Sequence, residues 1–174
     1  MPEYKLIDLK DENLSEEDHE WYSHLFLFLC KYIQNCDNIR NQANYNFSGH
    51  GAYDAFHLLF HDGGNVELPV AVAGMYNSGC YPQNTARVLQ RAYYHPDVRH
   101  KSLATHGGNH IKKALLAKYI LPEQLRIARD EFRREGVFFS VEFPMRRKSF
   151  ETIVGWMNNT TRPNMAYGKF ILSW

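Results

Sequence analysis

The sequence predicts an α+β domain built on a mainly antiparallel sheet. Three observations lead to this fold class. After one strand and one helix near the N-terminus, three strand-like segments follow one another, two helix-like segments begin at residue 103, and strand-like runs return after them. The length of 174 residues favours one domain, and a content of 44% hydrophobic and 14% aromatic residues is sufficient for a packed core.

The first elements are an edge strand and an amphipathic helix. Residues 4–9 alternate well enough for the strand. Ser15 is expected to begin the helix, because Ser15-Glu16-Glu17-Asp18 looks like a capping box with acids in the first turn. Apolar residues then recur at helical spacing and form one buried face: Trp21, Leu25, Phe28, Leu29, Tyr32, Ile33 and Cys36. The polar residues 37–52, rich in Asn and Gly, predict a loop.

An antiparallel meander follows this loop. A turn with two glycines at 61–65 joins its first two strands, and Pro69 indicates an edge or a bulge in the second. A turn with Gly79 and Pro82 leads to the third. The three strands are expected at Ala52–Phe60, Val66–Tyr76 and Thr85–His95.

Helices and buried strands make up the second half. Leu103–Tyr119 is helical in content, and Leu121-Pro122-Glu123 is expected to open another helix, because proline is tolerated at the first helical position. Gly136 is expected to end that helix. The remaining expected elements are a central strand at Val137–Phe143, a helix at Ser149–Asn159 and one closing strand at Met165–Trp174.

Charge and cysteine content exclude several classes of partner and site. Net charge is +1, from 20 basic and 19 acidic side chains, so no overall field attracts nucleic acid or an anionic membrane. The three cysteines, Cys30, Cys36 and Cys80, form no CxxC pair and indicate a reducing compartment, with structural roles for all three. The acidic N-terminus has no apolar signal core, and no run approaches 18 apolar residues. These features predict a cytoplasmic protein without nucleic-acid or membrane partners.

The turn after the meander has the composition of an anion site. Pro96 ends the strand, since proline has no N–H for the ladder. Arg99 and Lys101 bring positive charge, and the small residues Ser102 and Ala104 allow backbone N–H groups to approach a ligand where a helix starts. This combination predicts a phosphate-binding turn; the alternative is a solvated turn followed by an ordinary helix start.

This turn resembles the signature of the GNAT superfamily of N-acetyltransferases. In that family a hydrophobic-x-Pro-x-x-Arg turn is followed by (Arg/Gln)-x-x-Gly-x-(Gly/Ala). Tyr94-x-Pro96-x-x-Arg99 matches the first part and Arg99-x-x-Ser102-x-Ala104 the second, with Ser102 where glycine is usual. The motif covers about a dozen residues.

The order of elements resembles the same family over most of the chain. The resemblance implies an acyl-CoA N-acyltransferase-like fold, with a mixed, mainly antiparallel central sheet flanked by helices in a single domain over residues 1–174. Two further departures concern the acceptor side: an inserted helical segment near 105–121, and a final strand pair shortened to one clear strand.

The resemblance implies acetyl-CoA as acyl donor and no metal. In this family the strands equivalent to Thr85–His95 and Val137–Phe143 separate at a bulge, and pantetheine lies between them. An exposed N–H of the first strand would polarise the thioester carbonyl. The residues implied to bind the cofactor are Ala92, Tyr93, Tyr94, Arg99, His100, Lys101, Ser102, Leu103 and Ala104.

Direct attack by an amine needs a base and an acid. Glu142, acting through water, and His95 are the candidate bases; the alternatives are a surface carboxylate at a strand end and a histidine in a turn. The family's acid is a tyrosine on the helix after the second separated strand, and the corresponding segment here has none. Tyr94, Tyr119 and Tyr167 stay open as substitutes.

Other patterns carry weaker hypotheses. The histidine pairs 57/61 and 106/110 have an i, i+4 spacing, but the first runs through a strand into a turn and the second contains two glycines, so neither predicts a metal site. The basic residues Arg133, Arg134, Arg146, Arg147 and Lys148 indicate a solvated face or contacts with the cofactor's 3′-phosphate or an acidic acceptor. The predicted function is N-acetylation of a small-molecule or peptide amine. The alternative is a non-catalytic GNAT-like binding or structural module, and a homodimer stays open.

Overall fold

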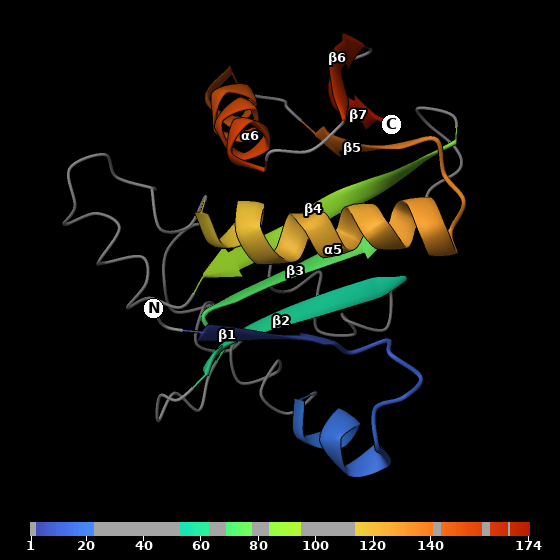
Figure 1. Cartoon of the computed structure of the whole chain (residues 1–174), viewed down its shortest axis with the longest axis vertical. Coiled ribbons are helices and arrows are strands. Elements are labelled where there is room, and N and C mark those ends of the chain that lie inside the picture. Colours follow the sequence, from blue (N-terminus) through green and yellow to red (C-terminus); the bar gives the residue numbers. More distant parts are fainter. Residues whose placement is uncertain are drawn as a thin grey trace, which may run out of the picture.

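A seven-stranded sheet forms the centre of the protein, in the order β1-β2-β3-β4-β5-β7-β6 (Figure 1). The computed structural model describes residues 3–22, 53–62, 69–77, 84–94, 114–140, 144–157, 161–166 and 168–174. Only the backbone is described for residues 3, 61–62, 90–94, 140, 144–147 and 149. The statements that follow concern these residues.

The sheet is mixed and mainly antiparallel, which confirms the predicted fold class. Every neighbouring pair of strands is antiparallel except β4 and β5, which run parallel. A parallel pair needs a crossover connection, and helical residues between the two strands supply part of it. The strands are β1 (Glu3–Asp8), β2 (Ala55–Asp62), β3 (Ala71–Tyr76), β4 (Thr85–Tyr94), β5 (Gly136–Ser140), β6 (Arg162–Ala166) and β7 (Lys169–Ser173).

The first strand and the three meander strands occur in the predicted order, but two have shifted bounds: β2 extends to Asp62, into the predicted turn, and β3 begins at Ala71, so Pro69 precedes this strand instead of lying within it. β1 is an edge strand, and β2, β3 and β4 pair in succession. The predicted helix after Ser15 is described as far as Tyr22, and the Ser15 side chain caps it, because its Oγ accepts a hydrogen bond from the Asp18 N–H at 3.1 Å. The rest of that predicted helix lies outside the described residues, as do all three cysteines and most of the turn at 61–65.

One continuous helix crosses a face of the sheet, from residue 114 to residue 131 (Figure 1). It consists of a π-helical segment η2 (Leu116–Ile120), the α-helix α5 (Leu121–Arg126) and a second π-helical segment η3 (Ile127–Glu131). The expectation that a new helix opens at Leu121 is wrong. Pro122 has no N–H, and in a regular α-helix its ring meets the carbonyl four residues earlier. The wider turn just before α5 accommodates the ring without ending the helix.

The helix ends earlier than predicted, and Gly136 does not end it. Its last helical residue is Glu131, and Arg133 then adopts the left-handed conformation with φ 55°. The Arg134 N–H returns to the carbonyl of Ala128 at 2.8 Å, so the chain closes in the manner of a helix C-cap. Gly136 instead begins β5, where a Cβ atom would collide with a carbonyl oxygen of β7.

The chain closes with a hairpin where one strand was expected. β6 and β7 pair antiparallel from Arg162↔Ser173 to Ala166↔Lys169. Gly168, with φ +68°, lies in the connection between them. The sequence prediction of a single strand over Met165–Trp174 is therefore wrong. The preceding helix, α6 (Pro144–Trp156), begins and ends before the predicted bounds Ser149–Asn159.

Two hydrophobic clusters pack on the two faces of the sheet, because successive residues of a strand point to opposite faces. The larger cluster joins the sheet to the helix 114–131 and to α6. The smaller one is aromatic and lies on β1, β2 and β3, where the ring of Tyr53 stacks on that of Tyr76 with 4.7 Å between centroids. Its buried members are Ile7, Leu9, Tyr53, Phe56, Leu58 and Val72.

Candidate functional site

β4 and β5 start side by side and then separate. Their described pairing covers only Thr85–Arg87 of β4 and Gly136–Phe138 of β5. Beyond Arg87, β4 continues along β3 to Tyr94, whereas β5 pairs with β7 up to Ser140. In Figure 1 the two strands run apart from their common start. Among the described residues, the edge of β4 that faces β5 therefore has no ladder partner after Arg87.

The common start of the two strands is fixed by contacts with the end of the helix. The Glu135 N–H donates to the carbonyl of Asn84 at 2.8 Å, directly before the first paired residues. Arg134 Nε donates to the Asn77 side-chain oxygen at 2.6 Å and ties the helix end to the end of β3. Trp174 Nε1 donates to the carbonyl of Arg134 at 3.0 Å. These bonds hold one end of the β4–β5 pair closed, so the separation lies toward the other end.

A backbone irregularity in β4 coincides with the point of separation. The register with β3 shifts between Tyr76↔Arg87 and Gly74↔Gln90, and again before Val72↔Tyr93, so β4 contains extra residues at two places. Leu89, within the first shift, has φ 52°, a conformation that a branched non-glycine residue rarely adopts. Bulges bend a strand and increase its twist. The bulge at Leu89 therefore explains why β4 leaves β5 here.

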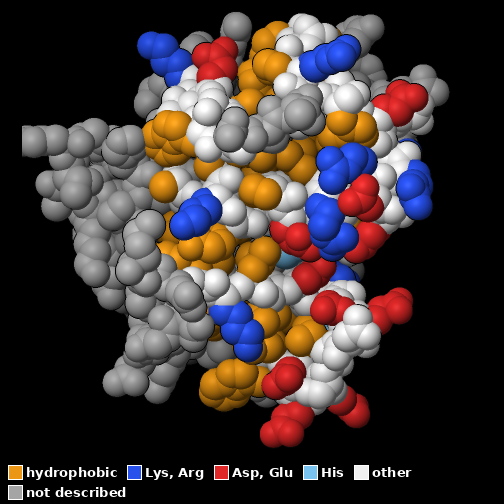
Figure 2. Space-filling view, in the orientation of Figure 1, with side chains coloured by type: hydrophobic (Ala, Val, Ile, Leu, Met, Phe, Trp, Pro, Cys, Tyr) orange, Lys and Arg blue, Asp and Glu red, His pale blue; other side chains and the backbone are white. Residues whose placement is uncertain are grey.

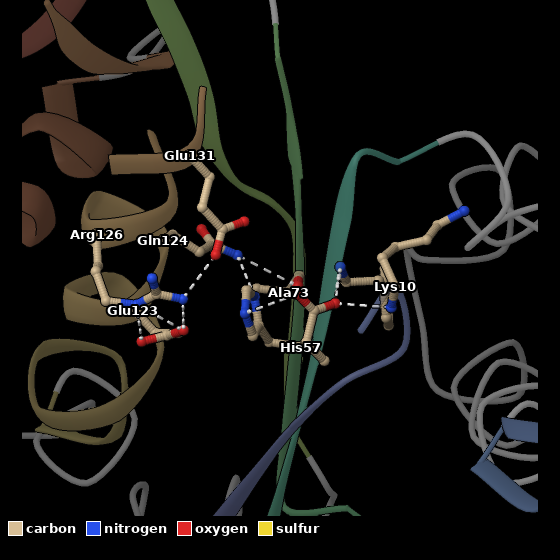
Figure 3. Close-up of polar contacts among 9 residues, drawn as sticks. Lys10, His57, Ala73, Glu123, Gln124, Arg126 and Glu131 are labelled. Carbon is tan, nitrogen blue, oxygen red and sulfur yellow. Dashed lines mark hydrogen bonds and ion pairs between the residues drawn. The ribbon is translucent and has the colours of Figure 1, made fainter. Parts of the chain in front are cut away.

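Gln124 of α5 binds this bulge from the helix above. Its side chain is fully buried, and its Oε1 accepts a hydrogen bond from the Leu89 N–H at 2.9 Å. Its Nε2 lies 3.3 Å from Nδ1 of His57 and 3.4 Å from the carbonyl oxygen of Ala73 (Figure 3). One amide thus joins α5 to β2, β3 and β4 in the interior, where an unpaired polar group is costly.

The direction of these hydrogen bonds fixes the tautomer of His57. The Leu89 peptide can only donate, so Gln124 must present its oxygen to β4 and its NH₂ group to His57. Nδ1 of His57 is then the acceptor, and the proton of the neutral ring is on Nε2. Nε2 lies 3.7 Å from Oδ2 of Asp8, too far for a hydrogen bond but close enough for electrostatic attraction.

His57 is therefore a neutral histidine in the core. Desolvation by burial lowers its pKa below the ordinary value of 6.5; Asp8, Glu123 and Glu131 oppose that shift, and Arg126 adds to it. Asp8 is itself held by backbone, since its Oδ1 accepts from the Lys10 N–H at 2.8 Å and from a β2 N–H at 3.2 Å. The directly opposed strand positions Asp8↔His57 and His57↔Ala73 place this polar row across three strands.

Two arginines of the helix 114–131 form ion pairs with acidic neighbours next to this row. Figure 2 shows basic and acidic side chains gathered together over the face that carries the helix 114–131. Arg126 contacts Glu123 at 2.6 Å and Glu131 at 3.0 Å, and the hydrogen bond with Glu123 is the main reason that the Arg126 pKa is raised. Arg129 pairs with Asp130, which lowers the pKa of that carboxyl. Arg126 and Arg129 on this face are therefore each paired with acidic neighbours.

The structure places only some of the sequence-predicted site residues. Ala92, Tyr93 and Tyr94 lie in the part of β4 beyond the bulge, and Tyr93 and Tyr94 pair there with β3; the side chains of all three are not described. The remaining predicted positions lie outside the described residues: Arg99, His100, Lys101, Ser102, Leu103 and Ala104 of the turn, and the candidate bases His95 and Glu142.

Tyr119 lies far from the separated strands. Its ring packs against that of Tyr4 on the edge strand β1, with 5.1 Å between centroids. β1 stands three strands from β4 in the sheet, or roughly 14 Å at about 4.8 Å per strand spacing. Tyr94, whose side chain is not described, and Tyr167, which lies outside the described residues, remain as candidate acids. Of the basic spots, Arg134 has the structural role given above, and Lys148 is exposed on α6.

The polar row of Asp8, His57 and Gln124 was not predicted from the sequence. Gln124 lies four residues after Ile120 and four before Ala128, both buried, so it is a polar residue on the apolar face of the helix. That position was the available signal. His57 was considered only as half of a metal pair. Within the described ranges, no group of three or more His, Cys, Asp or Glu could hold a metal ion, and no helix is long and apolar enough to cross a membrane.

No protein-family model and no curated protein sequence matches the chain. Solved structures with a similar arrangement include the N-acetyltransferase PseH of Campylobacter jejuni in complex with acetyl coenzyme A. It has a TM-score of 0.48 and 11% identity, with 98% of this chain and 96% of that chain covered. A probable acetyltransferase of Staphylococcus epidermidis has a TM-score of 0.44 and 12% identity over 100% and 98% of the two chains. Because both TM-scores are below 0.5, the description of the fold rests on the strand order and the geometry of β4 in this chain.

Proposed function

We propose that this chain is an acyl-CoA-dependent N-acetyltransferase that moves an acetyl group from acetyl-CoA to a primary amine by direct attack. The observation that carries the proposal is the separation of the parallel strands β4 and β5 after Arg87, at the bulge around Leu89. The resemblance of the sequence to the GNAT superfamily implies such a separation between these two strands. The strand order and the parallel pair agree with that expectation.

The backbone of β4 beyond the bulge would bind the pantetheine arm. The N–H and C=O groups on this edge of β4 have no strand partner among the described residues, so they can hydrogen-bond to a ligand. Pantetheine contains two amides that match such groups. Ala92, Tyr93 and Tyr94 would line it, and an N–H there would polarise the thioester carbonyl. The turn that follows would hold the pyrophosphate through its backbone and cations, with these residues: Arg99, His100, Lys101, Ser102, Leu103 and Ala104.

The chain's residues would then carry out two proton transfers, one from the attacking amine and one to the leaving thiolate. Acetyl-CoA supplies the activated acetyl group as a co-substrate. The neutral amine nitrogen bonds to the thioester carbonyl carbon, the C–S bond breaks, and the products are an amide and the free thiol of CoA. Glu142, through water, or His95 would take the amine proton, and Tyr94 or Tyr167 would protonate the leaving thiolate. No nucleophilic cysteine and no metal are needed for this transfer.

The wider setting follows from the same proposal. The acceptor would be a small molecule or a peptide with a primary amine, and the protein would act in the cytoplasm without nucleic-acid or membrane partners. The whole chain would form one GNAT-like domain with a helical insertion near 105–121, as a monomer or homodimer.

Thermal unfolding with added ligands tests the proposal. Acetyl-CoA or CoA at about 100 times its dissociation constant should stabilise the fold by roughly 2.7 kcal/mol, and NAD should have no effect. Release of free thiol from acetyl-CoA, measured with a mixture of amines, then tests turnover. Stabilisation without amine-dependent thiol release would indicate the alternative, a non-catalytic binding or structural module. Absence of any shift at millimolar CoA would refute both binding and catalysis.

A further inference from the structure

The bulge in β4 creates a backbone problem that the fold must solve. An extra residue in one strand leaves its N–H without a ladder partner. Here that N–H belongs to Leu89, which is buried, with 7% of its surface exposed. Water cannot satisfy it at that depth without a cavity of its own, and an orphaned buried donor is strongly unfavourable. Left to itself, the strand would gain by returning Leu89 to extended geometry and continuing its pairing with β5.

The solution comes from a different element, 35 positions along the chain. Gln124 of α5 accepts the Leu89 N–H at 2.9 Å, in a contact buried on all sides. The other end of the same amide is held by Nδ1 of His57 and by the carbonyl oxygen of Ala73, as Figure 3 shows. Because those two acceptors take the NH₂ group, the amide cannot flip, and its oxygen stays directed at β4.

We propose that Gln124 is a positioning residue for the cofactor: by accepting the Leu89 N–H it keeps the bulge in β4 and so holds β4 apart from β5. The inference rests on the proposed function, because it assigns the separated strands to acetyl-CoA. His57 and Ala73 contribute indirectly, because their hydrogen bonds orient the Gln124 amide toward Leu89. Gln124 contacts neither cofactor nor acceptor, and its effect passes entirely through the backbone of β4.

Three variants separate this role from plain stability. Gln124→Leu keeps the volume but removes the acceptor oxygen. Gln124→Glu keeps an acceptor for Leu89 and loses donor groups on the other side. Leu58→Ala removes volume from the smaller core cluster, which lies on the opposite face of the sheet, and serves as a control of comparable destabilisation without contact to the bulge. If the leucine variant does not fold, Gln124→Asn is used in its place. Its side chain is one methylene shorter, so the amide is kept but its oxygen no longer reaches the Leu89 N–H.

Two quantities are measured on each folded protein: the amide hydrogen-exchange rate of Leu89 and the dissociation constant of acetyl-CoA by calorimetry. In Gln124→Leu, or in Gln124→Asn in its place, Leu89 exchange should rise by about 10-fold or more, and the acetyl-CoA dissociation constant should rise by about 10-fold. Gln124→Glu should change both by less than about 3-fold. Leu58→Ala should lower the melting temperature and leave both quantities within about 3-fold of the parent.

The outcomes are distinguishable. Fast Leu89 exchange with unchanged affinity would overturn the positioning role, because the bulge would then be irrelevant to the cofactor. Weakened affinity with unchanged Leu89 exchange would overturn the route through this hydrogen bond. Equal loss of affinity in Leu58→Ala would reduce Gln124 to a stability residue. If the parent binds no acetyl-CoA while Leu89 responds to Gln124→Leu, the proposed function fails together with the cofactor role, although Gln124 still holds the bulge.

Discussion

Acid should destabilise this protein partly through one buried histidine, His57, and replacing it should remove that part. His57 is fully buried, and its Nδ1 must accept a hydrogen bond from the Gln124 amide, so the fold needs the neutral ring. Burial lowers its pKa from 6.5, against the opposing charges of Asp8, Glu123 and Glu131 and with a contribution from Arg126. As the pH falls through 6.5, His57 therefore becomes protonated in the unfolded chain while it is still neutral in the folded chain.

The sign and size of the effect follow from proton linkage. A pKa lowered on folding means that the unfolded state holds more protons below pH 6.5, so stability is complete above that pH and falls as the pH drops toward the folded pKa. A histidine with an unfolded pKa of 6.5 that stays neutral in the fold costs up to about 1.4 kcal/mol between pH 7.5 and pH 5.5.

Urea unfolding of the parent and of His57→Gln, followed by tryptophan fluorescence at both pH values, measures the difference. The variant loses stability at pH 7.5, because it repacks a buried site. The quantity that matters is the further loss on going to pH 5.5, which should be smaller in the variant by up to about 1.4 kcal/mol. Titration of the other histidines cancels in this comparison. If both proteins lost the same free energy of unfolding between pH 7.5 and pH 5.5, His57 would not be held neutral in the fold. The tautomer assigned from the Gln124 hydrogen bond would then also be wrong.

Three further predictions concern other positions. Arg99→Ala should weaken CoA binding by about 1.5–3 kcal/mol, as expected for a lost hydrogen bond to a charged group. The control is Arg129→Ala, an exposed residue paired with Asp130, which should leave CoA binding unchanged. Equal losses of affinity by calorimetry would contradict the assignment of the turn as the pyrophosphate site. Ser102→Leu should abolish CoA binding while Ser102→Gly retains it, and tight binding by the leucine variant would show that the turn does not approach the cofactor. Gly136→Ala should lower the free energy of unfolding by about 1–3 kcal/mol, because the added Cβ meets a β7 carbonyl. Gly155→Ala in α6 has open space around it and should raise the free energy of unfolding by about 0.5–1 kcal/mol. Urea unfolding that gave both changes the same sign would refute the packing argument.

The meander and the central strand could be predicted because their signals are local. Alternation within each strand, turn residues between strands and the apolar run at Val137–Phe143 each depend on neighbouring positions. The errors arose where a local signal had two meanings. Pro122 marks the start of a helix or a widened turn inside one, and the packing of the helix on the sheet decided for the second. Gly136 marks a helix end or a close approach of two strands, and the β7 carbonyl decided for the second.

The candidate site divides in the same way. The segment around Pro96 and Arg99 was found by its motif, which is a local pattern, and it lies outside the described residues. The bulge at Leu89 has no local pattern: Leu89 is a poor residue for φ 52°, and neither glycine nor asparagine marks the place. Reading Gln124 as a polar residue on an apolar face would have indicated a buried partner, but the partner's identity depends on how the helix docks.

The order of contacts along the chain explains why this bulge is a product of tertiary structure. Gln124 meets Leu89, Ala73 and His57 across sequence separations of 35, 51 and 67 residues. Contacts this distant close only after the entropy of long loops has been overcome, so local strand propensity acts first and favours an extended Leu89. The left-handed Leu89 becomes the stable form once the helix face reaches the sheet and offers its one polar side chain. The separation of β4 from β5, on which the proposed cofactor site depends, is therefore held by the same docking that completes the core.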